Sequence, residues 1–595
     1  MNTDKNKNQP VSKELADFFY CRIKINPVYL VLPYVHSEIF FLKHKSMVQT
    51  LIGYFISTNQ WIFFIRGYPW IIYLCEIKNE TSSMKYIQKY WTQNPLMVIM
   101  ALAIFVRLIA VIFARGFGMH DDHFLVIEPP QSWLDGHNFD NWLPSAERNW
   151  QPNGSSLLYP GFHFGFFWLL KQLNIVDPQV KMFILRFITA AFSLVTVFYG
   201  YKITEKISNT KSANMVGLLL AAWWMMPWLS VRNLVEIVCI PFLIWSVWIV
   251  LQKYNDPKPL RWFFLAGILL GVAFSIRYQT IFFAGGLGLA VLFDKKWKEM
   301  FAMAFGCLIS ITVVQCVPDM IMWGYPFAEL KQYINYNIIH RYDYFTGSFF
   351  KYFAFLLGVF IVPLGLYVFF GFFRGWKKYL IVFLPTFVFL LFHSIFPNKQ
   401  ERFIYSIIPF LFIVGIAGWN DFVEQSKYWA KHPKFYKGSW KFFWIINTLI
   451  LLVWTTSYSK KARVESMIYL SAYPNIHNLL LEDAFFQDTR MAPLFYLGQW
   501  PTVRQYTMSP DYSPIAKVYK NTTAKDLPDF VLFFTTKEID RRVDSVKKVV
   551  PHLVYEATFE PGFVDKVLFR MNKFNKNETI VVYRNADLVP VKRQK

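Results

Sequence analysis

Long apolar runs dominate the chain from residue 96 onward and decide its class. The runs lie at 96–114, 183–201, 213–230, 234–251, 262–276, 280–293, 299–317, 349–371, 379–396, 403–418 and 442–456. A membrane-spanning helix needs about 20 mostly apolar residues, so this pattern predicts about 11 transmembrane helices. The runs at 262–276 and 280–293 are short for that purpose, and we expect their helices to extend into the linkers.

The two ends of the chain follow other patterns. Residues 1–95 begin with a polar segment and continue with aromatic residues interrupted by charges, which indicates a cytoplasmic or interfacial N-terminal extension. Beyond residue 457 the apolar segments become short and alternate with polar positions. They predict strands at 529–534, 552–560 and 578–585 and a helix at 537–550. We therefore expect an all-α polytopic membrane domain at 96–456, followed by a small soluble α/β domain at 457–595.

Composition agrees with a membrane protein and excludes several other classes. The chain has 595 residues, is 54% hydrophobic, and has a mean hydropathy of +0.27. Only 17% of its residues are charged, against about 25% in ordinary globular domains. A soluble enzyme, a coiled coil and a disordered chain are therefore excluded. Its five cysteines form no CxxC pair and its histidines no HExxH pattern, so neither a disulfide framework nor a structural zinc site is expected.

The net charge of +23 is concentrated in alternate loops between the predicted spans. The basic loops are 202–212, 252–261, 294–298, 372–378 and 419–441. Because basic loops remain in the cytoplasm, this bias places the other loops and the C-terminal domain in the lumen or periplasm. The excess charge is then explained by topology, and no nucleic-acid partner is needed. The apolar segment 156–170, which belongs to the large external loop 115–182, contains Pro160 and Gly161 and is interpreted as re-entrant or interfacial.

The first external loop carries an unusual acidic and histidine-rich cluster directly after a span. It contains His120, Asp121, Asp122 and His123, and a further carboxylate follows at Glu128. A partly desolvated carboxylate has a raised pKa, and such a group can act as a general base. Two other interpretations remain open. The aspartates can cap a helix in a solvated loop, or the cluster can ligate a metal, although adjacent positions rarely converge on one ion.

A second cluster lies in the short external loop that contains Lys399 and Arg402. Two cations at a membrane interface suit a lipid phosphate, with arginine as a bidentate fork and lysine as a point charge. Snorkelling interfacial side chains are the alternative, and Glu401 between the cations weakens the anion site. Further charges lie within or at the ends of apolar runs, where they often mark a functional cavity or form ion pairs for packing. They are Arg107, Arg186, Glu236 and Arg277.

Two classes of function fit these features. A transporter fits the helix count, but it favours broken helices in two corresponding halves, and the chain shows no such halves. A membrane enzyme fits better, because the candidate chemistry lies in external loops. A non-catalytic assembly partner is a third alternative.

The order of these motifs resembles the Alg9-like mannosyltransferases, a glycosyltransferase family of the GT-C fold that includes the mannosyltransferases of GPI-anchor assembly. The first loop matches the family pattern at His120-Asp121-Asp122-His123-Phe124 and Glu128, followed by Leu158-Tyr159-Pro160. The late loop matches at His393-Ser394-Ile395-Phe396-Pro397-Asn398-Lys399-Gln400-Glu401-Arg402-Phe403-Ile404-Tyr405. Further matches are Arg232-Asn233 with Glu236, Arg277, and Asp319 with Trp323-Gly324 and Asn337. The departures are Asp122, Ser155, Asn398 and Gln400, which indicate a divergent member.

The resemblance implies a GT-C membrane enzyme that moves a hexose, mannose in this family, from a polyprenyl (dolichyl) phosphate to a glycolipid or lipid-linked glycan, with inversion. It implies Asp121 and Asp122 as catalytic residues, and Lys399, Arg402 and Arg277 as ligands of the donor phosphate. The residues implied to bind substrate are His120, Glu128, Tyr159, His393 and Glu236. We expect no cofactor and no metal, because the cations can neutralise the leaving phosphate. We expect an active site on the periplasmic or lumenal side of a bacterial inner membrane or the endoplasmic reticulum. The alternative is a transporter or flippase of lipid-linked sugars.

Overall fold

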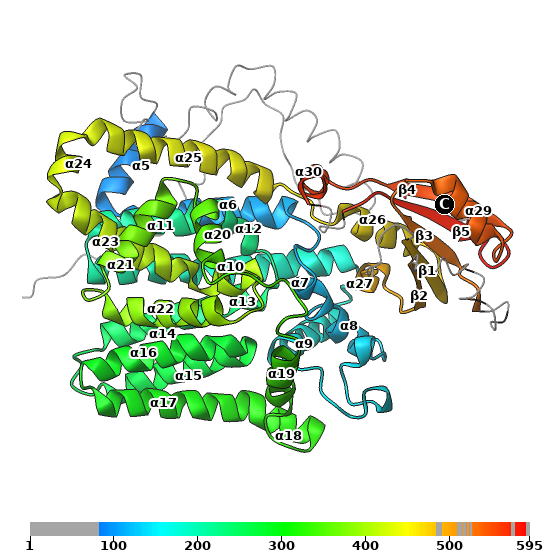
Figure 1. The fold of residues 1–595 in the computed structure, drawn as a ribbon, viewed down its shortest axis with the longest axis horizontal. Helices are drawn as coiled ribbons and strands as arrows, with labels where there is room; N and C mark the ends of the chain where they lie inside the picture. The colour runs from blue at the N-terminus through cyan, green and yellow to red at the C-terminus, as the bar shows by residue number, and fades with distance from the viewer. Residues whose placement is uncertain are drawn as a thin grey trace, which may run out of the picture. The chain divides into compact units, whose positions relative to one another are not determined.

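A computed structural model of the chain describes residues 82–483, 491–507, 515, 519, 523, 526–572 and 577–590. Most of the predicted N-terminal extension, residues 1–81, lies outside the described residues. Helices make up the described chain as far as residue 470 (Figure 1). In the first half these are α5 (Ser82–Gln93), α6 (Pro95–Phe113), α7 (Asp121–Phe124), α8 (Glu128–Leu134), η1 (Phe139–Asn141), η2 (Ala146–Arg148), α9 (Leu158–Gln172), α10 (Pro178–Ile207), α11 (Thr210–Ala222), α12 (Met225–Leu229), α13 (Val235–Val238), α14 (Ile240–Gln252), α15 (Leu260–Ile276), η3 (Tyr278–Thr280) and α16 (Ile281–Phe293). The second half contains α17 (Trp297–Ile311), the π-helical turn η4 (Thr312–Cys316), α18 (Val317–Trp323), α19 (Ala328–Ile339), α20 (Lys351–Val359), α21 (Leu364–Arg374), α22 (Leu380–Ile395), η5 (Glu401–Ile407), α23 (Ile408–Gln425), α24 (Lys427–Lys431), α25 (Pro433–Thr455) and α26 (Lys461–Leu470).

Each apolar run predicted from the sequence is helical, which confirms the all-α polytopic fold class. In the described part of the chain, 6 helices are long and apolar enough to cross a membrane. They are Pro95–Phe113, Pro178–Ile207, Val235–Gln252, Trp297–Trp323, Glu401–Gln425 and Pro433–Thr455. Shorter apolar helices stand beside them at Leu260–Ile276, Tyr278–Phe293, Leu364–Arg374 and Leu380–Ile395.

Three runs show details beyond the expectation. The helices at the two short runs begin two residues inside the predicted linkers, at Leu260 and Tyr278, but remain short at their other ends. Helix α15 ends at Ile276 because Arg277 has an extended backbone (φ −145°, ψ 105°) that cannot continue a helix. The run at 349–371 forms two helices, α20 and α21, because Pro363 cannot donate a backbone hydrogen bond within a helix.

The segment predicted to be re-entrant or interfacial is one continuous helix, α9. Pro160 does not interrupt it because it lies in the first helical turn, where its missing N–H has no intrahelical partner in any case. The position of α9 relative to the bilayer remains a prediction.

Close helix packing holds the bundle together beneath the loops that carry the candidate site residues. A Cβ atom on Gly267 of α15 would lie 1.9 Å from the carbonyl oxygen of Met303 on α17. One on Gly306 of α17 would lie 2.1 Å from the carbonyl oxygen of Phe264. Small residues of this kind let membrane helices approach closely, and here they fix α15, whose end carries Arg277.

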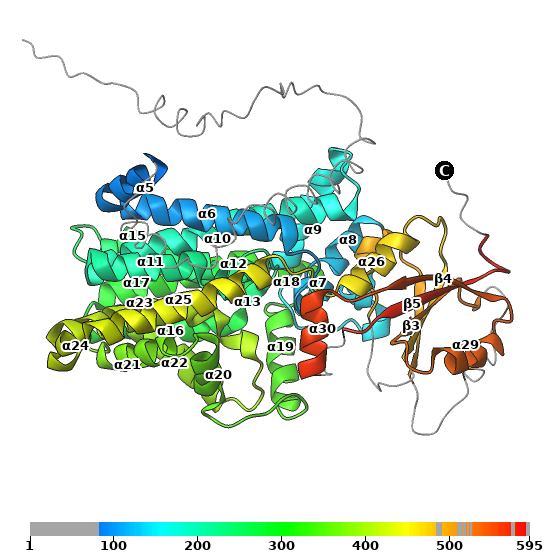
Figure 2. The same ribbon diagram turned by 90° about the horizontal axis from the view of Figure 1, so that it is seen from above.

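The C-terminal part forms a small α/β domain around one five-stranded sheet (Figures 1 and 2). Its elements are β1 (Asn478–Asp483), α27 (Leu494–Leu497), β2 (Thr502–Thr507), β3 (Phe530–Phe534), α29 (Ile539–Lys547), β4 (Leu553–Phe559), α30 (Phe563–Met571) and β5 (Ile580–Asn585). The strand order is β2-β1-β3-β5-β4, with β1 parallel to β2 and β3, and β5 antiparallel to β3 and β4. Leu480 of β1 is in register with Val531 of β3. The predicted strands and helix of this domain are confirmed, whereas β1, β2 and α30 were not predicted.

A shared hydrophobic core joins the segment between α6 and α10 to this domain. Phe124 of α7 and Phe167 of α9 belong to the same buried cluster as Leu481 of β1 and Phe495 and Tyr496 of α27. Burial of apolar surface on this scale is the main source of stability for such contacts. The short helix α7, which carries the candidate base, is therefore held between the membrane bundle and the C-terminal domain.

Candidate active site

Asp122 shapes the turn that precedes α7. Its carboxylate accepts hydrogen bonds from the backbone N–H groups of Gly118 (2.7 Å) and Met119 (3.1 Å). Arg232 supports the same turn by donating to the carbonyl oxygens of Gly116 (2.7 Å) and Arg115 (3.3 Å). Burial raises the pKa of Asp122, and the charge of Arg232 and the two amides oppose that rise. The helix-capping alternative is therefore wrong for Asp122, because α7 has no side-chain cap and the carboxylate accepts from amides that precede the helix. Its carboxylate instead fixes the turn beside Asp121.

Asp121 is the accessible member of the pair. Its side chain is 29% exposed and forms an ion pair with Arg402 of η5. Burial would raise the pKa of Asp121, but Arg402 and a weaker contribution from His120 outweigh it and hold the pKa below its ordinary range. The expectation of a raised pKa is therefore wrong for Asp121 while Arg402 is paired with it. The reason is the guanidinium of Arg402, whose proximity to α7 no sequence pattern shows.

Four charged side chains from distant segments form one row. Arg402 follows Asp121, and its Nη1 lies 3.9 Å from Oε1 of Glu236 on α13. The same Glu236 oxygen accepts a hydrogen bond from Nη1 of Arg277 at 2.6 Å. Two cations and two anions alternate, so the row is neutral as it stands. Helices α7, α13 and α19 lie near one another around it in both views (Figures 1 and 2).

The row retains unused hydrogen-bonding capacity. Oε2 of Glu236, Nε of Arg277 and Nε2 of His393 are buried and have no hydrogen-bond partner. Buried polar atoms are usually satisfied, so such atoms call for an explanation. Nε of Arg277 can donate to an anionic group, whereas Oε2 of Glu236 and Nε2 of His393, whose Nδ1 already donates to the carbonyl oxygen of Phe389, can accept from hydroxyl groups of a ligand.

Lys399 does not join this row. Its ammonium donates to the backbone carbonyl oxygens of His393 (3.0 Å), Ser394 (2.7 Å) and Phe396 (2.7 Å). The residue is 1% exposed, and an ammonium has three protons to donate. All of them are directed to the C-terminal end of α22, where cations satisfy the unpaired carbonyl groups. Lys399 therefore stabilises the loop that carries Arg402.

The same loop is also held from the start of α20. Lys351 donates to the carbonyl oxygen of Lys399 (2.8 Å), and Tyr352 donates to that of Gln400 (3.2 Å). Oε1 of Gln400 accepts a hydrogen bond from Nε of Arg402 at 2.9 Å. Gln400, one of the departures from the family pattern, thus orients the arginine.

Glu128 and Tyr159 lie close by but in buried positions. Glu128 accepts hydrogen bonds from Nε2 of His123 (2.8 Å) and from the backbone N–H of Phe495 (2.8 Å), and its side chain is fully buried. Burial raises the pKa of Glu128, and the contact with His123 opposes that rise. The hydroxyl of Tyr159 donates to Asn233 at 3.4 Å, and burial raises its pKa. Glu128 joins the loop to the C-terminal domain and is closed to solvent.

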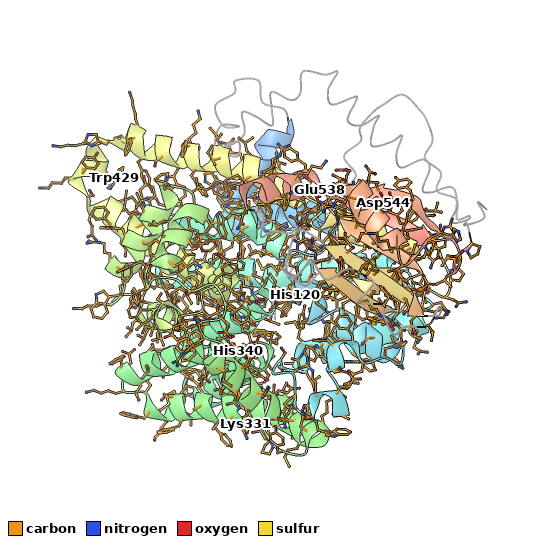
Figure 3. The ribbon with its side chains drawn as sticks, turned by 45° about the vertical axis from the view of Figure 1, so that its right-hand side comes forward. His120, Lys331, His340, Trp429, Glu538 and Asp544 are labelled. Atoms are coloured by element: carbon orange, nitrogen blue, oxygen red, sulfur yellow. The ribbon has the colours of Figure 1, made fainter. Side chains whose placement is uncertain are left out.

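The two histidines that flank Asp121 and Asp122 point to different partners. His120 is exposed, and its Nε2 lies 2.9 Å from the sulfur of Met491 (Figure 3). His123 is stacked between Phe117 and Tyr496, at ring separations of 4.8 and 5.3 Å. Among the residues that the structure describes, no three histidine, cysteine or acidic side chains are grouped as metal ligands. Metal independence remains a prediction.

Sequence reasoning missed Tyr333 of α19. Its hydroxyl is hydrogen-bonded to Gln279, and it lies in the electric field of Arg277, Glu236 and Arg402. Burial raises its pKa, and the neighbouring guanidinium of Arg277 opposes that effect. No motif marked Tyr333, because it reaches the row only through its contacts with Tyr278 and Gln279 of η3.

Solved structures share the fold of this helical membrane bundle with its small C-terminal domain, which is a GT-C fold. ArnT from Cupriavidus metallidurans bound to undecaprenyl phosphate aligns with a TM-score of 0.55 at 12% identity, covering 83% of this chain and 99% of that one. Its apo state aligns with a TM-score of 0.53 at 13% identity, covering 84% and 100%.

The chain belongs to the Alg9-like mannosyltransferase family, whose family model matches residues 97–490. GPI mannosyltransferase 3 of Debaryomyces hansenii is 20% identical to it over 413 residues, which cover 64% of this chain and 69% of that protein. The resemblance stated from the motifs is thereby confirmed.

Proposed function

We propose that this chain transfers a hexose, mannose by family, from a polyprenyl (dolichyl) phosphate to a glycolipid or lipid-linked glycan. The observation that carries the proposal is the row Asp121–Arg402–Glu236–Arg277. It combines one accessible carboxylate with two guanidinium groups. The solved ArnT structure of this fold is bound to undecaprenyl phosphate, which supports a lipid phosphate as the donor's anchor.

In the proposed reaction Asp121 takes the proton of the acceptor hydroxyl. The acceptor oxygen then forms a bond to the anomeric carbon, and the bond from that carbon to the phosphate oxygen breaks with inversion. The bonding electrons remain on the phosphate, where Arg402 and Arg277 neutralise the growing negative charge. The acceptor and the phosphate lie on opposite sides of the sugar carbon, so Arg402 turns from Asp121 to the phosphate when the donor binds.

This exchange of partners explains how Asp121 becomes a base. With the donor absent, Arg402 holds the pKa of Asp121 low. A bound phosphate competes for the guanidinium and compensates its charge, so the pKa of Asp121 rises toward the range of a general base. The remaining site residues have positioning roles: Asp122 and Glu128 fix α7, and Lys399 fixes the loop of Arg402.

The proposed site lies on the lumenal or periplasmic side. The charge bias of the loops supports this side. The basic loops 202–212 and 294–298, which are expected to remain in the cytoplasm, connect the helix ends that lie opposite the site.

The test measures mannose transfer from polyprenyl-phosphate mannose to a lipid extract of the source cells, with a chelator present. We expect transfer by the wild type and its loss in Asp121→Asn. The control is Asp140→Asn in the same external loop, where an exposed Asp140 pairs with Arg148 at 3.4 Å. Donor binding without transfer by a folded wild type would contradict the proposal and favour a transporter.

A further inference from the structure

Helix α30 of the C-terminal domain has its apolar side facing away from the protein. Within this nine-residue helix only Asp565 is buried. Phe563, Val567 and Met571 are 76%, 39% and 78% exposed. They stand four residues apart and so share one face of the helix. A surface helix of a soluble domain normally shows the opposite arrangement, with its apolar side inward.

The buried side of α30 is attached to the chain where two candidate spans end. Asp565 accepts a hydrogen bond from the backbone N–H of Lys461 at 3.1 Å. A Cβ on Gly562, which precedes the helix, would lie 2.8 Å from the carbonyl oxygen of Tyr458. These residues closely follow α25, whose last residue is Thr455.

A second span ends at the same place. The backbone N–H of Ser459 donates to the carbonyl oxygen of Arg115 at 3.1 Å, and α6 ends just before, at Phe113. Figure 2 shows α30 in red running across the direction of α6 and α25, and Figure 1 shows it nearly end-on. The helix therefore lies parallel to the membrane plane at the level of the span ends.

We propose that α30 is an interfacial helix that seats the C-terminal domain on the lipid surface. Phe563, Val567 and Met571 enter the boundary between headgroups and acyl chains, about 5–10 Å deep for helices of this type. Lys566 and Arg570 flank the apolar face and reach lipid phosphates, as basic residues of interfacial helices do. Lys566 also pairs with Glu560 at 3.0 Å, on the exposed side.

The occupant of this face is identified by photo-crosslinking of the full chain in lipid nanodiscs. p-Benzoylphenylalanine replaces Phe563 in one variant and Tyr555, an exposed aromatic residue of β4, in the control. We expect lipid adducts at position 563 and none at 555. Adducts to residues 1–81, adducts to a second copy of the chain, or an absence of adducts at 563 would each overturn the proposal.

Hydrogen exchange provides an independent measurement in the same nanodiscs. In the double variant Phe563→Asp and Met571→Asp, we expect the amides of α30 to exchange about tenfold faster, because two apolar side chains leave the bilayer. The amides of α29 are the internal control and should not change. Unchanged exchange in α30 would show that its apolar face is not held by lipid.

Discussion

The substitution Asp121→Asn tests the exchange of partners proposed for Arg402. Asparagine keeps the size of the side chain but removes both the charge and the basic oxygen. Positioned general bases contribute about 10²–10⁴ in rate, so we expect turnover to fall by that factor. In the same variant Arg402 loses the carboxylate that competes with the donor phosphate, so the donor should bind more tightly.

The expected gain in donor binding can be estimated from how far the ion pair between Asp121 and Arg402 is exposed to solvent. The Arg402 and Asp121 side chains are 14% and 29% exposed. Pairs that remain in contact with solvent are worth up to about 1 kcal/mol, which corresponds to about a fivefold lower Kd for polyprenyl phosphate. The stability of the fold should change by no more than that amount.

The assay combines single-turnover mannose transfer with titration of polyprenyl phosphate in detergent micelles. Asp140→Asn, which breaks the exposed pair with Arg148 in the same loop, should leave both quantities unchanged. Near-wild-type turnover in Asp121→Asn would refute the assignment of the base. Lost turnover with weaker donor binding would instead show that Asp121 supports the phosphate site and does not compete with it.

Three further predictions concern single sites, and a fourth concerns metal. Lys399→Met removes three hydrogen bonds at the end of α22, and thermal unfolding should show a loss of at least about 1.5–3 kcal/mol, which is the contribution of one bond to a charged group. Arg277→Met removes the nearer of the two guanidinium groups beside Glu236, leaving Arg402 at 3.9 Å, and should destabilise by up to about 3–5 kcal/mol, and adding Glu236→Gln should restore most of it. Burial and the charge of Asp319 raise the pKa of Glu329 above its ordinary 4.5. The folded state thus binds this proton more tightly, so its contribution is complete below pH 4.5 and is lost as pH rises through the raised pKa. A stability profile of Glu329→Gln should be flatter in that window, and an unchanged slope would contradict the assignment. Chelator should leave mannose transfer unchanged, and rescue by added divalent metal would disprove metal independence.

The membrane fold could be predicted because a run of apolar residues indicates burial in lipid, whichever other segments of the chain pack against it. Strand β3 could also be predicted from local sequence, because its run of five apolar residues is buried along its whole length. Strands β1 and β2 were missed because Asn478–Asp483 and Thr502–Thr507 carry charged or polar residues. Their pairing depends on contacts across the sheet, which no local pattern contains.

The candidate site was predictable as a set of residues but not as a geometry. Asp121, Glu236, Arg277 and Arg402 were singled out separately, and the structure brings them into one row. The motif also contained Lys399, yet its ammonium is directed to the end of α22. A motif shows which residues act together, but the direction of a lysine depends on which carbonyl groups the fold leaves unpaired.

The buried contact between Glu128 and the backbone of Phe495 has a consequence for how the gene can be divided. A chain shortened before α27 would retain the membrane bundle but leave one Glu128 oxygen without its amide donor. The carboxylate of Glu128 would then be left with an unsatisfied oxygen while still bound to His123 of α7, the helix that carries Asp121. The C-terminal domain is therefore not a detachable module. Fusion partners, purification tags and truncations belong beyond β5, and domain exchange with a relative must transfer residues 117–134 together with the sheet.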